Sequence, residues 1–339
     1  MRYFIIVFLL MSLMSHSQKG TLIVLNKSDD TADLIDLESR ESVVTLPTGD
    51  GPHEVAISPD EKTAVITNYG RKYWPGSSLT VIDIPNKKVV KTISLSYKAP
   101  HGIEFIDENR LLVTCEESKR LVIINYTTGR AEGNIDTQQE TSHMVVYSPK
   151  YKRAFVANIR SGSISVVDVE NRTLEKIIKT GNGAEGLTLS ADESEVWVTN
   201  RADNTISIVN TESLTIEETL VSKEFPIRAK GTADGKYILV SNAKTGDVHI
   251  FEASTRKLVK NISMEVTAKE KEASRLFQDF DDSPVPVGIL ILPDNSFAFV
   301  ANTNADVITV IDLEKMEITD RLTAGKEPDG LGYSSIMLK

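Results

Sequence analysis

The chain has 339 residues, 40% of them hydrophobic, which is enough to bury a sizeable core. Its formal net charge of −10 argues against a phosphate-backbone partner, because such a partner calls for a basic face, and we expect no nucleic-acid binding. The single cysteine, Cys115, cannot form an internal disulfide, so the fold must hold by packing alone.

Residues 1–17 have the pattern of a secretory signal peptide. Arg2 supplies a positive charge, residues 3–14 are apolar, and residues 15–17 offer a small-residue cleavage site before Gln18. Twelve helical residues reach only ~18 Å, short of the ~30 Å hydrocarbon core, so we expect cleavage and no membrane span. The mature chain, residues 18–339, is therefore predicted to be secreted or periplasmic.

Short predicted strands follow in chain order. Residues 21–26, 33–36 and 42–46 predict three strands with no strand before them. A four-strand unit then starts at Pro52 and carries a long loop, residues 69–76, between its second and third strands. Further units start at Pro100, Ser142, Ala184 and Pro226.

The unit over residues 142–181 is the clearest. It predicts strands at 144–148, 153–158, 163–169 and 174–178, separated by turns rich in Gly, Pro and Asn. Four short strands in about 40 residues are typical of one blade of a β-propeller.

Residues 263–284 interrupt the repeat between the fifth and sixth units. Residues 267–280 suit a helix that starts at Thr267, with its apolar side chains on one face. We interpret it either as a surface helix packed on the propeller or as a partial lid over a central channel.

The sixth unit starts at Pro286, and residues 328–333 predict a lone strand at the C-terminal end. Joined with the three N-terminal strands, this strand completes a seventh blade and removes the open sheet edge. We therefore predict an all-β, seven-bladed propeller over residues 18–339, with four strands in each blade. We expect it to be a monomer.

Asparagines recur at the ends of short apolar runs. Asn158, Asn200 and Asn242 are 42 residues apart, in runs such as Val-Trp-Val-Thr-Asn200, and Asn68 and Asn302 end similar runs. These runs resemble the repeat of the YVTN β-propeller family over essentially the whole mature chain. The resemblance implies the propeller fold strongly and function poorly, because such folds host binding proteins, scaffolds and a few enzymes.

A second recurring position, here named the ring slot, lies about 15 residues before these asparagines. It is held in chain order by His53, His101, His143, Glu185, Ile227, Val287 and Asp329. The resemblance implies that the ring slot faces the central channel at its top rim. The order then gives an arc of five polar residues and an apolar gap beside the 263–284 insertion.

The three histidines allow three interpretations. They could bind a transition metal such as Zn, Cu or Fe, with His53, His101 and His143 as ligands. They could bind a small molecule or an anion together with Glu185, Asp329 and Arg228. They could also be structural, with each imidazole hydrogen-bonded to a neighbouring loop carbonyl.

Other residues carry weaker expectations. Glu54 and Glu104 lie near ring histidines in sequence and could pair with them. Glu54 directly follows His53 in a strand, so we expect it to point away from the channel. Trp74 in the 69–76 loop is a candidate contact for a ligand or partner. The asparagines are expected to be structural, with each amide hydrogen-bonded to the backbone of the following turn, and Cys115 is expected to be inert. Basic residues on the same loops, which could gather around an anion, are Arg71, Arg160, Arg201 and Lys244.

The sequence thus favours an extracytoplasmic binding or scaffold protein with its ligand or protein partner at the top face. An enzyme that uses the histidine arc, either metal-dependent or similar to the lactone-hydrolysing propellers, is the alternative. No particular cofactor follows from the sequence beyond a possible transition metal.

Overall fold

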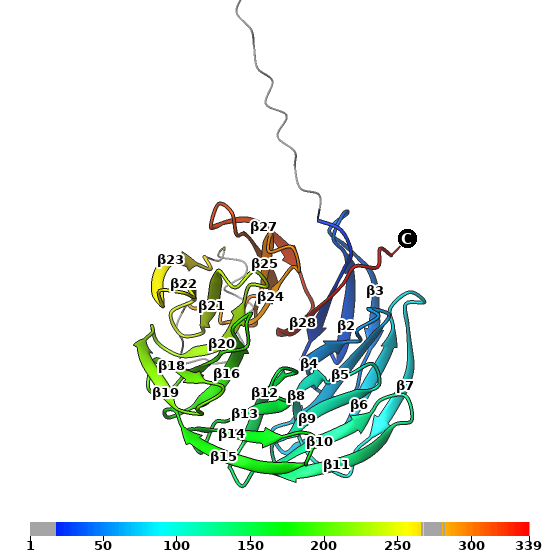
Figure 1. Ribbon diagram of the computed structural model, residues 1–339. Helices are drawn as coiled ribbons and strands as arrows, with labels where there is room; N and C mark the ends of the chain where they lie inside the picture. Colours follow the sequence, from blue (N-terminus) through cyan, green and yellow to red (C-terminus); the bar gives the residue numbers. More distant parts are fainter. Residues whose placement is uncertain (1–17, 266, 268–279, 281, 339) are drawn as a thin grey trace, which may run out of the picture.

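The computed structural model describes residues 18–265, 267, 280 and 282–338. These residues contain 28 strands, which form seven four-stranded antiparallel sheets. Figure 1 shows that the sheets are arranged in a ring. The predicted all-β, seven-bladed propeller is confirmed. Within the described ranges, no helix has the length and apolar character needed to cross a membrane.

The blades follow each other in chain order, each starting with its innermost strand. Blades one to three consist of β4 (Pro52–Ile57), β5 (Thr63–Arg71), β6 (Trp74–Asp83) and β7 (Lys88–Ser94); β8 (Pro100–Phe105), β9 (Arg110–Cys115), β10 (Arg120–Asn125) and β11 (Arg130–Asp136); and β12 (Ser142–Ser148), β13 (Arg153–Asn158), β14 (Ser163–Asp168) and β15 (Thr173–Lys179).

Blades four to six repeat this order. They consist of β16 (Ala184–Leu189), β17 (Glu195–Asn200), β18 (Thr205–Asn210) and β19 (Ile216–Val221); β20 (Pro226–Gly231), β21 (Tyr237–Asn242), β22 (Asp247–Glu252) and β23 (Lys257–Ser263); and β24 (Pro286–Ile291), β25 (Phe297–Asn302), β26 (Val307–Asp312) and β27 (Glu317–Thr323).

Blade seven joins the two ends of the propeller chain, as predicted. Its strands are β28 (Pro328–Ser334), β1 (Thr21–Asn26), β2 (Thr31–Asp36) and β3 (Glu41–Pro47). The innermost strand β28 pairs antiparallel with β1, with Thr21 opposite Ser334 and Asn26 opposite Pro328. Because the last strand completes the first sheet, the ring has no open blade.

The hydrophobic core is divided among the seven interfaces between neighbouring blades. In β1, for example, Leu22 and Val24 pack against blade six, whereas Ile23 and Leu25 pack against blade one. Successive side chains of a strand point to opposite faces of its sheet. A middle strand between two blades therefore needs apolar residues at every position, and β1 is buried throughout.

The recurring asparagines are structural, as expected, but their partners differ from those predicted. Each Nδ2 donates to a polar side chain on the third strand of its own blade, and Asn302 donates to the Val300 and Val307 carbonyls as well. The Nδ2 donors and hydroxyl acceptors are 2.9–3.0 Å apart in Asn158–Ser165, Asn200–Ser207 and Asn302–Thr309.

Blade two replaces both members of this pair by apolar residues, Cys115 and Val122, which share one core cluster. An asparagine beside Val122 would lack that hydroxyl partner. Both positions of the pair are therefore apolar in blade two, whereas both are polar in the other blades. Burial raises the pKa of the Cys115 thiol to about 12, in agreement with the inert role expected for it.

The two predicted insertions have different outcomes. Residues 69–76 were expected to form a loop, but they continue β5 and β6 as a longer hairpin, with Gly70 opposite Pro75 and Arg71 opposite Trp74. The predicted helix at 267–280 lies almost entirely outside the described residues.

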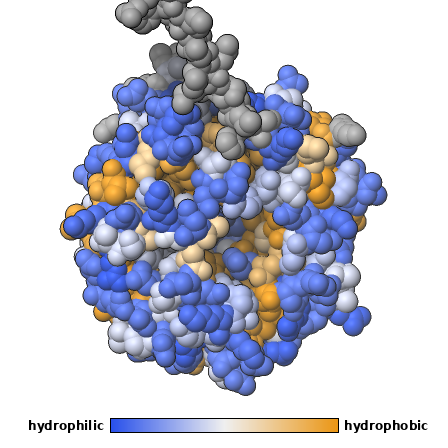
Figure 2. Space-filling model, turned by 45° about the horizontal axis from the view of Figure 1, so that its top comes forward, coloured by the Kyte–Doolittle hydropathy of each residue, from blue (hydrophilic) through white to orange (hydrophobic). Residues whose placement is uncertain are grey.

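Figure 2 shows a mainly hydrophilic face with hydrophobic side chains gathered in a recess near its middle.

Candidate functional site in the central channel

Every blade begins with the same backbone turn before its ring slot. The residue two positions before the slot has φ between 54° and 75° in all seven blades, namely in Gly51, Ala99, Thr141, Gly183, Phe225, Val285 and Glu327. Its carbonyl accepts a hydrogen bond from the residue that follows the asparagine position, as in Tyr69 N–H to Gly51 O at 3.0 Å. A left-handed conformation is costly for a β-branched residue such as Val285, so the fold imposes it.

A β-bulge follows directly, and it changes which side chains reach the channel. In blade one the pairing moves from Pro52 opposite Asn68 to Val55 opposite Ile66, which leaves an extra residue in β4. A bulge interrupts the alternation of side chains along a strand. The prediction that Glu54 points away from the channel is therefore wrong: its Oε1 lies 2.8 Å from Nη2 of Arg228.

The position after the ring slot is glycine in four blades, at Gly102, Gly186, Gly288 and Gly330. A Cβ on any of them would lie 2.1–2.6 Å from the carbonyl oxygen of the next blade's slot residue. In blades one and five, where this position is Glu54 and Arg228, the carbonyl of the next slot residue accepts a hydrogen bond from the hydroxyl just before the asparagine position: Thr67 to His101 O at 2.8 Å and Ser241 to Val287 O at 2.9 Å. The backbone of the ring is thus fixed by contacts between blades.

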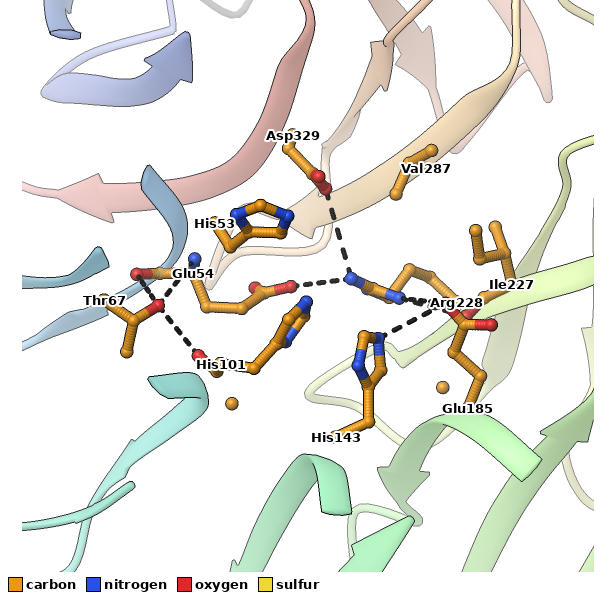
Figure 3. A network of polar contacts seen from close by, with 12 residues as sticks. His53, Glu54, Thr67, His101, His143, Glu185, Ile227, Arg228, Val287 and Asp329 are labelled. Atoms are coloured by element: carbon orange, nitrogen blue, oxygen red, sulfur yellow. Dashed lines mark hydrogen bonds and ion pairs between the residues drawn. The ribbon is translucent and has the colours of Figure 1, made fainter. Parts of the chain in front are cut away.

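The three ring histidines form one continuous group of imidazoles (Figure 3). The ring centroids of His53 and His101 are 4.9 Å apart, and those of His101 and His143 are 3.6 Å apart with a 35° angle between the planes. Tyr69, from the extended hairpin, packs 4.6 Å from His53 and 5.5 Å from His101. The ring slot therefore brings the predicted histidines together.

His143 has a carboxylate at each ring nitrogen. Its Nδ1 hydrogen-bonds to Oε1 of Glu116, and its Nε2 lies 3.3 Å from Oε1 of Glu185. Burial alone would lower the pKa of His143, but Glu116 and Glu185 raise it above the ordinary value. The charged imidazolium is therefore favoured at this position.

His53 and His101 are neutral near pH 7. Burial and the charge of Lys27 lower the pKa of His53 to about 4. Burial and the neighbouring His143 bring the pKa of His101 well below its usual value. Nδ1 of His53 is 2.8 Å from the Gly51 carbonyl, which can only accept, so Nδ1 carries the proton and Nε2 keeps its lone pair.

Arg228 connects the carboxylates of the ring across the channel (Figure 3). Its guanidinium lies 2.8 Å from Glu54, 3.5 Å from Glu185 and 4.0 Å from Asp329. Burial by itself would raise the pKa of Glu185, but Arg201 and His143 outweigh it and lower that pKa to about 2. The predicted ligand residues Arg228, Glu185 and Asp329 thus already neutralise each other inside the protein.

A second tier of residues, just after the asparagine position, contacts the ring slot. Lys27 Nζ lies 3.2 Å from Asp329, Arg201 Nη1 lies 2.5 Å from Glu185, and the Tyr69 hydroxyl donates to Glu116 at 2.7 Å. Sequence reasoning missed Lys27, Tyr69 and Glu116 as site residues. The repeat could have identified these three residues, because each directly follows an asparagine position and therefore recurs with the same period.

The apolar gap of the ring is covered by more apolar residues. Ile227 and Val287 form a buried cluster with Ala243 and Val285. Phe225 and Phe280 pack against this cluster, with their ring centroids 4.9 Å apart. The polar arc and the apolar gap therefore lie side by side, in the order that the sequence gives.

The other predicted contacts lie elsewhere or have acidic partners. Trp74, at the hairpin tip, is 78% exposed. Arg71 lies 2.7 Å from Asp30, and Lys244 lies 2.6 Å from Glu224. Within the described residues, Arg160 is exposed and forms no ion pair. The basic loop residues thus do not gather into an anion ring.

Glu104 lies apart from the histidines, in a cavity of about 390 Å³ near the other end of the innermost strands. Ile103, Phe105, Lys230 and Leu331 are among the residues that line this cavity. Burial raises the pKa of the Glu104 carboxyl to about 7, against a smaller opposite effect of Lys230. The predicted pairing of Glu104 with a ring histidine is therefore wrong.

We expect Glu104→Gln to make the protein more stable than the wild type above pH 7, by ~2 kcal/mol for this half-buried group. The folded-state pKa of about 7 exceeds the ordinary value of 4.5, so the folded protein binds this proton more tightly. The resulting stability is present below pH 4.5 and is lost as the pH rises through 7. Urea unfolding at pH 5, 7 and 8.5 measures the difference, and a pH-independent difference would contradict the expectation.

Comparisons with known proteins agree with this architecture. A family model described as "YNCE-like beta-propeller" matches residues 12–111 and 111–272. No curated protein matches the chain significantly.

Three solved structures are similar to the chain. Hydrazine synthase of Kuenenia stuttgartiensis has a TM-score of 0.69 at 17% identity, covering 82% of this chain and 88% of its own. A functionally unknown protein from Desulfotomaculum acetoxidans DSM 771 has a TM-score of 0.74 at 14% identity, covering 93% of this chain and 99% of its own. The dihydro-heme d1 dehydrogenase NirN, in complex with DHE, has a TM-score of 0.64 at 16% identity, covering 92% of this chain and 75% of its own.

At these identities the three structures show the shared fold alone. The family model covers well over half of the chain, and the seven closed blades agree with it. The chain belongs to the YNCE-like β-propeller family.

Proposed function

We propose that this protein is an extracytoplasmic binding protein whose ligand is held by the ring slot and its second tier. The observation that carries the proposal is a set of buried polar atoms without a hydrogen-bond partner among the described residues. Nδ1 of His101 and Oδ1 of Asp329 are two of them, in residues that are only 2% and 4% exposed. A buried polar atom without a partner costs ~1–3 kcal/mol, so a ligand that satisfies such an atom gains affinity.

Two further observations support the proposal. Residues 1–17 have the composition of a signal peptide, which supports the proposed location of the mature chain outside the cytoplasm. Among the similar structures, NirN is described in complex with DHE, so a chain of this fold does carry a small molecule.

Mass spectrometry of the protein from its own organism tests the binding site. We expect the native mass of the wild type to exceed its denatured mass by one bound species. The variant His101→Ala should lose that species, whereas Glu104→Gln, a site outside the ring, should keep it. Circular dichroism confirms that both variants are folded. Absence of any extra mass in the wild type, or its retention in His101→Ala, would overturn the proposed site.

The same preparation separates a binding protein from an enzyme and tests the location. A bound species that is released unchanged fits a binding protein, whereas its chemical conversion during incubation fits the alternative of an enzyme. N-terminal sequencing should find Gln18 as the first residue of the exported protein. An intact residue 1 in a cytoplasmic fraction would contradict the location.

A further inference from the structure

We propose that His101, Glu116 and His143 bind one divalent transition-metal ion, of the zinc or copper class. This inference rests on the proposed function, because it names the ligand of the same site. One ligand atom from each residue lies within 4.8 Å of the other two. All three residues are buried, with exposed fractions of 2%, 9% and 7%. The trio differs from the predicted His53, His101 and His143, because Glu116 takes the place of His53.

The donor set suits such an ion. Imidazole nitrogens favour zinc, copper and iron among the divalent ions, and a carboxylate oxygen completes a common three-residue set. Nδ1 of His101 has no protein partner, so its lone pair or proton is not engaged elsewhere. The Tyr69 hydroxyl holds Oε2 of Glu116 at 2.7 Å, which leaves Oε1 directed at Nδ1 of His143.

The surrounding groups provide what a metal site needs in its second layer. Glu185 lies 3.3 Å from Nε2 of His143, on the opposite side of the ring from Glu116. With the ion on Nδ1, the Nε2–H group donates to this carboxylate, an arrangement that orients metal-binding histidines in many proteins. The Thr67 and Thr114 hydroxyls hold the backbone carbonyls of His101 and His143, so the ligands start from fixed positions.

The ion replaces a proton in this geometry. The space between Nδ1 of His143 and Oε1 of Glu116 is occupied by a hydrogen bond. The imidazoles of His101 and His143 are stacked at 3.6 Å, and their lone pairs lie in the ring planes, so one ring must turn for both nitrogens to meet one ion. Three protein ligands leave one position of a tetrahedral ion open for water or a small anion.

His53 provides the discriminating comparison. It belongs to the same group of imidazoles, but its Nδ1 is already engaged with the Gly51 carbonyl and it lies outside the converging trio. If the site is the one proposed here, removing His53 leaves all three ligands in place. If the histidines alone formed the site, removing His53 would be as harmful as removing His143.

Titration of the chelator-treated, full mature protein with Co²⁺ and Zn²⁺ tests the inference. We expect saturable binding of one ion per chain, with visible Co²⁺ absorption bands that Zn²⁺ removes. His143→Ala and Glu116→Gln should each weaken binding by more than about 100-fold, whereas His53→Ala should change it by less than about tenfold. Glu104→Gln is the matched carboxylate control and should bind as the wild type does.

Three results would overturn the inference. They are the absence of one-to-one binding, unchanged affinity in folded His143→Ala, or a loss in His53→Ala equal to that in Glu116→Gln. The proposed function is tested separately by the extra mass of the native protein. An organic species bound in a protein that takes up no metal removes this inference and leaves the proposed function standing.

Discussion

Replacing Arg228 by methionine is expected to lower the free energy of unfolding by ~3–5 kcal/mol, the cost of breaking a buried ion pair from one side. The guanidinium is the shared partner of Glu54, Glu185 and Asp329 and has a side-chain exposure of 8%. Without it, the buried Glu185 and Asp329 and the partly buried Glu54 are left without this shared positive charge. Urea unfolding at pH 8 measures the loss.

The loss should depend on pH with a definite sign. Burial already raises the pKa of Glu54 even with Arg228 present, and removing the positive charge raises it further. The folded variant then takes up protons more tightly than the unfolded chain, so the loss shrinks as the pH falls from 8 to 5.

Two further variants serve as controls for Arg228→Met. Adding Glu54→Gln should recover part of the stability, because it removes one of the unpaired charges. Arg160→Met, at an exposed arginine, should stay within ~0.5 kcal/mol of the wild type. An Arg228→Met protein as stable as Arg160→Met would show that the network contributes little.

The second large effect is expected at the junction where the ring closes. Gly288→Ala places a Cβ 2.1 Å from the backbone carbonyl oxygen of Asp329. Neither backbone can move freely, because β24 and β28 are the innermost strands of blades six and seven. We expect a loss of at least about 3 kcal/mol in unfolding free energy, at the upper end for an overpacked site.

Gly133→Ala is the matched control for this substitution. Its new Cβ would meet only the flexible side chain of Arg172, at 3.1 Å or more, and Gly133 also lies in a strand. It should be neutral or slightly stabilising, because alanine restricts the unfolded chain more than glycine does. Equal effects of the two substitutions in thermal unfolding would contradict the proposed crowding at the junction.

The fold could be predicted because its determinants are local and repeated. The runs that end at Asn158, Asn200 and Asn242 fix the period, and the strands predicted around them match those observed closely. The left-handed turns before each blade could not be predicted, since residues such as Ala99 and Val285 do not favour that conformation. There the packing between blades overrides the local preference.

The site was predictable in position but not in its contacts. The ring slot located the histidines correctly, because residues at one repeat position share one place in the ring. The side of the strand on which Glu54 lies was predicted wrongly, because the alternation of side chains assumed for a strand does not reveal a bulge. The link between Glu54 and Arg228 joins residues 174 positions apart, and no local pattern contains it.

The hydroxyl contacts between blades have a consequence for how this protein can change. Thr67 and Ser241 hold the ring through main-chain carbonyls, so the path of the backbone does not depend on which side chain occupies a slot. One main-chain geometry already carries imidazole, carboxylate and branched aliphatic groups. The ring therefore resembles a seven-position display, in which a slot residue can be exchanged while the path of the backbone stays the same. Under the binding function proposed above, relatives of this chain would diverge in ligand by exchanging slot residues alone.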